Sequence, residues 1–342
     1  MLKNWSALYL GDIVDIIAPA KGSYNDVMQA IEFLKELGLT PRVASGLVKS
    51  PEELMQIGYD PFCSNTDEER LKFVKEALLA PDSKVVWAIR GGYGCSSIVE
   101  ALNKLEIPMQ PKLLIGFSDI TVLHIFIQQR WQWSSLHANC LKQLIGRDIK
   151  DQIVTEMQDI LFAKSKEISF VNFKLCNEVS KKSQTIESVI TGGNLCLIET
   201  SIGTSWQINA TNKILLLEDV GERGYSVDRT LEHLKQARLL DGVKAVIFGH
   251  FAESMESDGT DLVPYAIKKF ANNIDIPVIQ INEIGHINEN KPIPLGASCI
   301  LKLGEEKSLI CNTGVEMSSS DSLIVEESLI CRMNHEYKNY KE

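Results

Sequence analysis

Residues 112–121 read Lys112-Leu113-Leu114-Ile115-Gly116-Phe117-Ser118-Asp119-Ile120-Thr121 and predict a short strand that turns sharply into a helix. The apolar run 113–115 suits a buried strand, Gly116 permits a tight turn, and a helix is expected over 122–127. Ser118 is then expected above the sheet edge, next to backbone N–H groups without intrahelical partners. This is the geometry of a nucleophile elbow, although Ile120 breaks the Gly-x-Ser-x-Gly pattern. Most such turns only cap a helix, so this segment alone does not establish catalysis.

Apolar strand-like runs alternate with amphipathic helical stretches on both sides of this segment. Strands are expected at about 13–18, 85–89, 113–115, 214–217, 245–248 and 277–281, and helices at about 25–37, 66–79, 226–240 and 262–272. This alternation predicts an α/β protein with a largely parallel sheet. The length of 342 residues suggests two domains.

We expect four segments along the chain. Residues 1–146 are expected to form an N-terminal α/β domain that carries Ser118, and residues 185–317 a C-terminal α/β domain. The more polar stretch 147–184 is expected to be a linker with some strand content. The serine-rich, charged residues 318–342 are expected to be a polar tail, partly disordered.

The composition and net charge of the chain exclude some classes of binding partner. Apolar residues make up 44% of the chain and charged residues 23%, as in ordinary soluble globular proteins. The net charge of −10 argues against nucleic acid or an anionic membrane as the main partner and is compatible with a small peptide substrate. No signal-peptide pattern and no run of membrane-spanning length is seen, so we expect a cytoplasmic protein.

The cysteines and histidines follow no metal-binding pattern. The eight cysteines include no Cys-x-x-Cys pair, and the six histidines include no His-x-x-x-His spacing. We therefore expect free thiols in a reducing compartment, no metal and no cofactor.

Three polar side chains at the carboxyl ends of predicted strands are candidates for nucleophilic chemistry. Ser118 follows one strand, Glu218 ends another, and His286 lies a few residues past a third. A serine nucleophile needs a base and a group that orients the base, and ligands of open α/β folds gather at this edge of the sheet. Each also has a structural explanation, since Glu218 would suit a turn cap and His286 an exposed loop.

Other histidines compete for the role of base. His250 also ends a predicted strand, and His137 lies in the segment Ser135-Leu136-His137. His124 falls within the helix after Ser118 and is expected to be structural or solvent-facing.

A glycine-rich loop, Arg90-Gly91-Gly92-Tyr93-Gly94, follows the strand at 85–89. Its glycines would suit a phosphate at a helix N-terminus, a backbone N–H that approaches an oxyanion, or a plain tight turn. The phosphate interpretation is the weaker, because the spacing is not Gly-x-Gly-x-x-Gly and no Gly-Lys-Ser/Thr follows.

Several short motifs in this order resemble the LD-carboxypeptidase family of serine peptidases, which also contains the microcin C self-immunity peptidases. The resemblance runs from about Asp12 to Gly314. Besides 90–94 and 115–121, the motifs are Ile17-Ala18-Pro19-Ala20, Gly192-Gly193-Asn194-Leu195, Leu217-Glu218-Asp219-Val220-Gly221-Glu222 with Tyr225-x-x-Asp228-Arg229, and Gly285-His286 with Pro294-Leu295-Gly296.

The resemblance implies a Ser–Glu–His triad in that chain order. Ser118 would be the nucleophile, His286 the general base and acid, and Glu218 the group that orients His286. The same resemblance favours His286 over His250. Glu222 matches a second acidic position of the motif, but Glu218 directly ends the strand, as the family's glutamate does.

The resemblance also implies a substrate and its contacts. The N–H groups of Asp119 and Gly92 would form the oxyanion hole, and Arg90, Gly91 and Tyr93 would bind substrate. Arg90 is the candidate for the terminal carboxylate, with a structural role as its alternative. The reaction would release D-alanine from murein tetrapeptide through an acyl-enzyme, during cytoplasmic cell-wall recycling.

The family's architecture implies a flavodoxin-like or Rossmann-like N-terminal domain, a smaller swivelling-type C-terminal domain and a homodimer. This chain departs from the family pattern at Ser97, commonly arginine, at Phe117, commonly tyrosine, and at His137-Ala138-Asn139, commonly His-Gly-Pro. These departures leave the identity of the substrate open.

Two alternatives remain. One is a detoxifying peptidase that cleaves a peptidyl or aminoacyl nucleotide. Trp131 and Trp133 are its candidates to stack on the base, with a core or surface role as their alternative. The other is a muropeptide-binding sensor without turnover, although such a site has no need of the three residues Ser118, Glu218 and His286.

Overall fold

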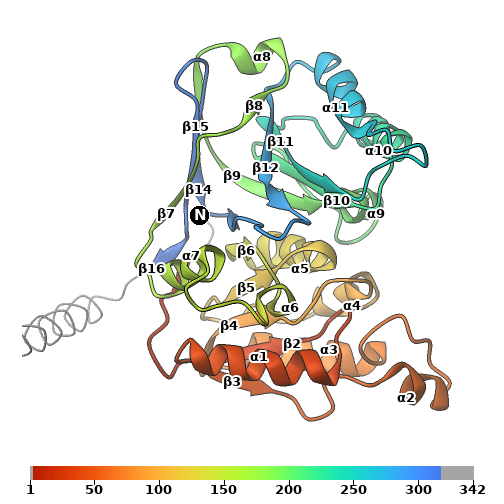
Figure 1. The fold of residues 1–342 in the computed structure, drawn as a ribbon, viewed down its shortest axis with the longest axis vertical. Coiled ribbons are helices and arrows are strands. Elements are labelled where there is room, and N and C mark those ends of the chain that lie inside the picture. The colour runs from red at the N-terminus through yellow and green to blue at the C-terminus, as the bar shows by residue number, and fades with distance from the viewer. Residues whose placement is uncertain (1–2, 317–342) are drawn as a thin grey trace, which may run out of the picture.

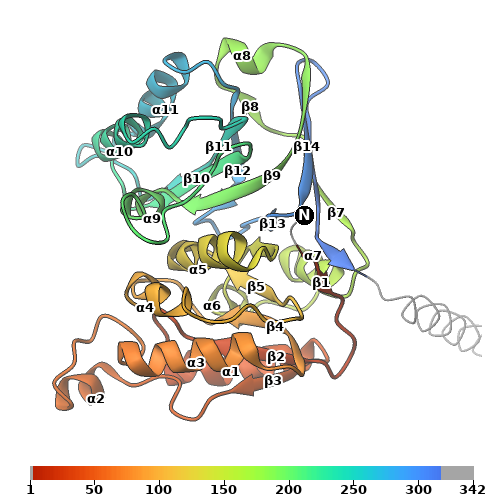
Figure 2. The same ribbon diagram turned by 180° about the vertical axis from the view of Figure 1, so that it is seen from behind.

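Two parallel-rich sheets build the protein, whose structure is a computed structural model that describes residues 3–316. The N-terminal half, red to yellow in Figure 1, lies below the C-terminal half, green to blue, and Figure 2 shows the same arrangement from behind. The predicted α/β class is confirmed. The predicted tail 318–342 lies outside the described residues.

The N-terminal half contains a six-stranded sheet in the order β13-β6-β5-β4-β2-β3. Its strands are β2 (Ile13–Ile17), β3 (Thr40–Val43), β4 (Ser83–Ala88), β5 (Leu113–Gly116), β6 (Ser135–His137) and β13 (Ile293–Leu295). The five strands β2 to β6 are parallel in the flavodoxin-like order, and β13 joins antiparallel to β6. The order reverses between β2 and β4, so the loops after these two strands border the crevice where such folds bind ligands.

Helices flank this sheet, and side-chain caps explain where several of them begin. The helices of this half are α1 (Tyr24–Glu36), α2 (Pro51–Gln56), α3 (Asp67–Leu79), α4 (Cys95–Leu102), α5 (Thr121–Phe126) and α6 (Leu141–Leu144). Ser23 caps α1 and Thr66 caps α3, each by accepting a backbone N–H three residues on. Every helix within residues 3–316 is too short or too polar to cross a membrane.

The C-terminal half contains an eight-stranded sheet in the order β7-β15-β14-β9-β10-β11-β12-β8. Its strands are β7 (Glu167–Phe170), β8 (Lys174–Leu175), β9 (Gln184–Asn194), β10 (Ile214–Val220), β11 (Ala245–Ala252), β12 (Val278–Gly285), β14 (Ser298–Leu303) and β15 (Ser308–Asn312). Strands β9 to β12 are parallel, and helices α9 (Leu195–Thr200), α10 (Gly224–Gln236) and α11 (Val263–Asn272) connect them.

Strand β12 is longer than the sequence pattern predicts. The apolar run ends at Ile281, but the strand continues to Gly285, because the pairing with β11 shifts register and His250 pairs with Gly285. His286 therefore follows its strand directly instead of lying some residues beyond it.

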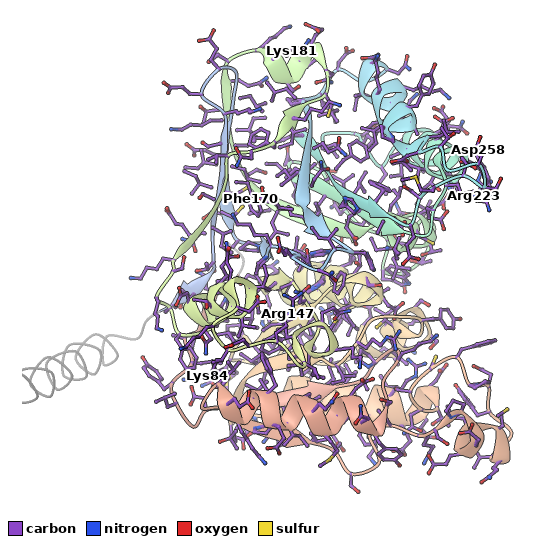
Figure 3. All side chains as sticks on the ribbon, viewed as in Figure 1. Lys84, Arg147, Phe170, Lys181, Arg223 and Asp258 are labelled. Atoms are coloured by element: carbon purple, nitrogen blue, oxygen red, sulfur yellow. The ribbon has the colours of Figure 1, made fainter. Side chains whose placement is uncertain are left out.

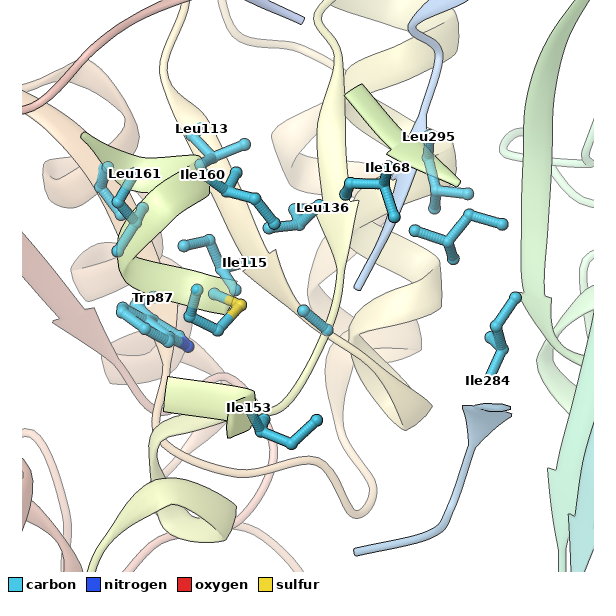
Figure 4. Close-up of a cluster of buried hydrophobic side chains, with 14 of the residues drawn as sticks. Trp87, Leu113, Ile115, Leu136, Ile153, Ile160, Leu161, Ile168, Ile284 and Leu295 are labelled. Atoms are coloured by element: carbon cyan, nitrogen blue, oxygen red, sulfur yellow. The ribbon is translucent and has the colours of Figure 1, made fainter. Parts of the chain in front are cut away.

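Residues 147–184, for which we predicted a linker with some strand content, hold α7 (Gln152–Leu161) and α8 (Glu178–Lys181) besides β7 and β8. The apolar face of α7 packs into a core that both sheets share. Figure 4 shows Ile153 of α7 near Trp87 and Ile115 of the first sheet, with Ile284 of the second sheet in the same cluster. Since burial of apolar surface drives folding, this shared core couples the two halves.

The two ends of the described chain meet. Strand β1 (Trp5–Ser6) pairs in parallel with β16 (Val315–Glu316), and the buried Trp5 indole donates to the Thr313 carbonyl at 3.1 Å. The first and last strands of the described residues thus lie side by side.

Candidate active site

Ser118 occupies a strained turn between strand β5 and helix α5. Its φ is +62°, in the left-handed region that costs a non-glycine residue roughly 1–2 kcal/mol. Residues that keep such a conformation cluster at functional sites. The turn is a nucleophile elbow in its geometry, as predicted, and Ser118 is partly exposed there.

The glycine loop lies directly against Ser118. A Cβ atom on Gly91 would lie 2.7 Å from the Ser118 Cβ, so only glycine fits at this position without displacement. Asp119 joins the two segments, because its buried carboxylate accepts the Cys95 N–H at 2.8 Å at the start of α4. Burial raises the pKa of Asp119, and this helix-terminal contact opposes the rise.

Two backbone donors in these segments have no acceptor. Within residues 3–316, the N–H groups of Asp119 and Gly92 donate to no carbonyl or side chain. The two N–H groups could therefore donate hydrogen bonds to an anionic oxygen above Ser118, as the donors of an oxyanion hole do.

Glu218 and His286 form a hydrogen-bonded pair at the carboxyl ends of β10 and β12. The His286 Nδ1 lies 2.7 Å from Glu218 Oε2, and the Glu218 side chain is fully buried. Glycines make this approach possible, since a Cβ on Gly249 would lie 2.9 Å from the Glu218 Cβ. A Cβ on Gly285 would lie 3.2 Å from Oε2.

A second imidazole faces the same carboxylate. His137 is fully buried, and its Nε2 lies 3.6 Å from Glu218 Oε1. Burial by itself would raise the pKa of Glu218, but His137 and His286 outweigh it and lower the pKa to about 2. Burial opposes protonation of His286, yet Glu218 holds the pKa of His286 above its ordinary value. Glu218 is therefore ionised at neutral pH.

An aromatic contact brings the pair to the serine turn. The ring centroids of His286 and Phe117, the residue before Ser118, lie 4.7 Å apart. Among the described residues, Ser118 Oγ makes no hydrogen bond, a geometry common in peptidases without bound substrate. Arg147, labelled between the two halves in Figure 3, donates to the Asn288 carbonyl at 2.5 Å and so ties down the loop after His286.

Two of the other residues that compete for a role, His124 and Glu222, have hydrogen-bond partners outside the Glu218–His286 pair. His124 is fully buried, donates from Nε2 to the Gly116 carbonyl and accepts from the Ser135 hydroxyl at Nδ1, so its predicted solvent-facing alternative is wrong. Burial lowers the pKa of His124 to about 3. Glu222 accepts a hydrogen bond from the Ser226 hydroxyl.

The two tryptophans proposed as a stacking platform are core residues. Trp131 is 1% exposed and Trp133 0%, and their ring centroids lie 4.8 Å apart beneath the surface. Neither indole is available to stack on a base.

Among the predicted substrate-binding residues, Arg90 and Tyr93 are exposed beside the buried Gly91. The Tyr93 ring meets Phe62 edge to face with centroids 6.5 Å apart, and the Cys63 thiol donates to the Tyr93 carbonyl at 3.2 Å. Within residues 3–316, no three His, Cys, Asp or Glu side chains gather as metal ligands would.

One supporting residue was not singled out from the sequence. Asp219 follows Glu218 and accepts from Asn194 Nδ2 at 2.7 Å and from the Cys196 N–H at 2.9 Å. Burial and the neighbouring Glu218 raise the pKa of Asp219 to about 6. Asp219 thus anchors the start of α9, as Asp119 anchors α4, and the parallel is visible only in three dimensions.

Comparison with known proteins places these features in a family. Residues 14–138 match the family model for the LD-carboxypeptidase N-terminal domain, and residues 187–301 match that for the C-terminal domain. A protein of Rickettsia conorii named "Putative carboxypeptidase RC0549" is 38% identical over 82% of this chain and 84% of its own. The murein tetrapeptide carboxypeptidase of Pseudomonas aeruginosa is 26% identical over 84% of this chain and 92% of its own.

A solved structure agrees with these relatives. The crystal structure of the muramoyltetrapeptide carboxypeptidase from Oxalobacter formigenes superimposes with a TM-score of 0.73 at 26% identity. It covers 88% of this chain and 98% of the other. The similarity therefore extends over both halves of the molecule.

Proposed function

The chain belongs to the LD-carboxypeptidase family, and from this premise we propose that it is a serine peptidase that hydrolyses an L,D-amide bond. The proposed substrate is murein tetrapeptide, from which it would release terminal D-alanine. The observation that carries the proposal is the approach of the Glu218–His286 pair to the strained turn of Ser118, through the contact between His286 and Phe117. The proposed setting is cytoplasmic cell-wall recycling, and the proposed assembly is a homodimer.

The tautomer of His286 follows from its bond to Glu218. Nδ1 carries the hydrogen that it donates to the carboxylate, so Nε2 is the free acceptor. In the proposed reaction Nε2 takes the proton of Ser118 as Oγ attacks the carbonyl carbon of the amide. Glu218 stays ionised and stabilises the imidazolium that forms.

The attack gives a tetrahedral intermediate with a negatively charged oxygen, which then breaks down to the acyl-enzyme. The oxyanion accepts hydrogen bonds from the N–H groups of Asp119 and Gly92, and His286 gives its proton to the departing amine of D-alanine. Water, deprotonated by His286, attacks the ester on Ser118 and releases the shortened peptide. We propose that the exposed Arg90 binds the terminal carboxylate, with Gly91 and Tyr93 beside it.

The direct test is a panel of substrates with product detection by mass spectrometry. We expect the protein to release D-alanine from the L,D-tetrapeptide and to leave the tetrapeptide ending in L-alanine intact. An aminoacyl sulfamoyl adenosine serves as the nucleotide-type substrate. Cleavage of that compound alone would contradict the murein assignment, and binding of the tetrapeptide without any cleavage would favour the sensor.

The loss of activity at acid pH should begin at a higher pH than for an ordinary histidine base. His286 must be neutral to accept the serine proton, and Glu218 raises the pKa of His286, so the active fraction is lost earlier as pH decreases. We expect the acid limb of kcat/KM to lie above about pH 6.5, the ordinary histidine value. A profile from pH 5 to pH 9 measures it, and an acid limb well below that value would contradict the assignment of His286 as base.

The substitution Gly91→Ala should reduce turnover without unfolding the protein. Its methyl group would lie 2.7 Å from the Ser118 Cβ and would push the glycine loop or the serine aside. Because a displaced oxyanion donor loses much of its effect, we expect kcat to fall by about 10²-fold. Steady-state kinetics and the thermal unfolding midpoint check this together, and an unchanged kcat in the folded variant would argue against the loop's role.

A further inference from the structure

Arg70 is a buried arginine whose hydrogen-bonding capacity is fully used. It lies in α3 and is 1% exposed, although arginine is rarely buried without close partners. All five of its N–H donors find acceptors. These are the carbonyls of Asn65 at 3.2 Å, Gly94 at 2.8 Å and Pro19, the Asp67 carboxylate, and the Ser97 hydroxyl at 3.1 Å.

The three carbonyl acceptors belong to three segments that meet at the switch point of the first sheet. Pro19 lies in the loop after β2, Asn65 lies in the loop before α3, and Gly94 ends the glycine loop after β4. The guanidinium group thus holds together the two loops that border the crevice. A planar group with fixed donor directions suits this task better than a flexible ammonium group.

The contact with the glycine loop requires the absence of a side chain. Gly94 has φ +142°, and a Cβ there would lie 2.5 Å from the Arg70 Nη1. Ser97, in the first turns of α4, accepts from Arg70 and donates to the Gly94 carbonyl at 3.0 Å. Arg70 and Ser97 therefore bind the same carbonyl at the end of the loop.

The start of α4 is held from two sides. Asp119, next to the proposed nucleophile, accepts the Cys95 N–H, and Arg70 binds the adjacent Gly94 carbonyl. These two contacts bind the C-terminal end of the glycine loop, and the Lys21 N–H, which donates to the Gly91 carbonyl at 3.3 Å, binds its start. Release of either of the first two contacts would let the Gly92 N–H move relative to Ser118.

We propose that Arg70 is a positioning residue for the peptidase reaction: it holds the glycine loop so that the Gly92 N–H faces the oxyanion above Ser118. This inference rests on the proposed function. Arg70 touches neither substrate nor the reacting atoms and acts only through the loop. Its loss should therefore weaken transition-state stabilisation more than substrate binding.

The test is D-alanine release by the full chain, native and with Arg70→Ser, Arg70→Lys or the double change Arg70→Ser/Ser97→Arg. We expect Arg70→Ser to lower kcat by about 10- to 100-fold with KM within about threefold, since a preorganised donor is displaced and not removed. Arg70→Lys should behave similarly, because lysine offers three donors without the planar fork.

The double variant separates positioning from stability. The native Ser97 Oγ lies 3.1 Å from the Arg70 Nη2, so an arginine side chain at position 97 would start beside the same carbonyls. We expect it to recover about tenfold of the lost kcat. The control is Arg229→Ser, an exposed arginine of α10, which should leave kcat unchanged.

Hydrogen exchange gives a readout independent of catalysis. The amides of residues 91–95 should exchange faster in Arg70→Ser, or in Arg70→Lys should the serine variant fail to fold. Native kcat in folded Arg70 variants, or a loss that follows only the folded fraction and is not recovered by the double variant, would overturn the inference. A native protein that cleaves no peptide would overturn the proposed function itself, and the inference with it.

Discussion

Ser118→Ala should abolish turnover while substrate still binds. Without Oγ no acyl-enzyme can form, and loss of the nucleophile alone in a serine peptidase costs about 10⁴- to 10⁶-fold in kcat. The tetrapeptide should bind with nearly native affinity, because no predicted carboxylate or loop contact is removed. Single-turnover kinetics and calorimetric binding measure the two quantities separately. Retention of more than about a hundredth of the native kcat would remove Ser118 as the nucleophile.

A matched variant tests the strain of the turn. Glycine adopts φ +62° freely, whereas alanine is subject to the same steric cost as serine. Ser118→Gly should therefore be more stable than Ser118→Ala by about 1 kcal/mol, and equally inactive. Equal unfolding free energies of the two variants would contradict the strained elbow.

Glu218→Gln should be nearly as damaging as loss of the serine. A glutamine that donates its amide hydrogen to His286 Nδ1 forces the hydrogen onto Nε2, which then cannot accept the serine proton. The corresponding change of acid to amide in the chymotrypsin triad lowers kcat by about 10⁴-fold. We expect a loss of this order, with the folded structure kept because the side chains are similar in volume.

Glu222→Gln is the control for this change. Glu222 lies four residues further on, is bonded to Ser226 and makes no contact with His286 among the described residues. Its substitution should change kcat by less than about twofold. Equal losses in the two variants would show that the assignment of Glu218 over Glu222 is wrong.

The sequence predicts the alternation of strands and helices, and it places Ser118 and Glu218 at the ends of strands. Apolar runs and their caps locate β5, β10 and α3 to within a few residues, since local pattern determines local structure. Because the carboxyl ends of parallel strands share one edge, Ser118 and Glu218 were expected between the two sheets. The register shift that extends β12 and brings His286 next to its strand has no signal in the sequence.

The pattern of apolar and polar residues does not predict contacts between residues that are far apart in the chain. Trp131 and Trp133 are flanked by polar residues in the sequence, and only the three-dimensional packing shows that both are buried. His137 reaches Glu218, and Arg70 reaches the glycine loop, through contacts with residues far away in the chain. No local signal predicts a backbone carbonyl as the partner of a particular arginine.

The most direct test of the proposed triad is the identification of the acylated residue. The native protein is mixed with tetrapeptide, quenched in acid, digested and mapped by mass spectrometry, with Ser118→Ala alongside. We expect a tripeptidyl ester on Ser118 in the native protein, and neither the adduct nor D-alanine release in the variant. An adduct on another residue, or D-alanine release by Ser118→Ala at the native rate, would contradict the proposed triad.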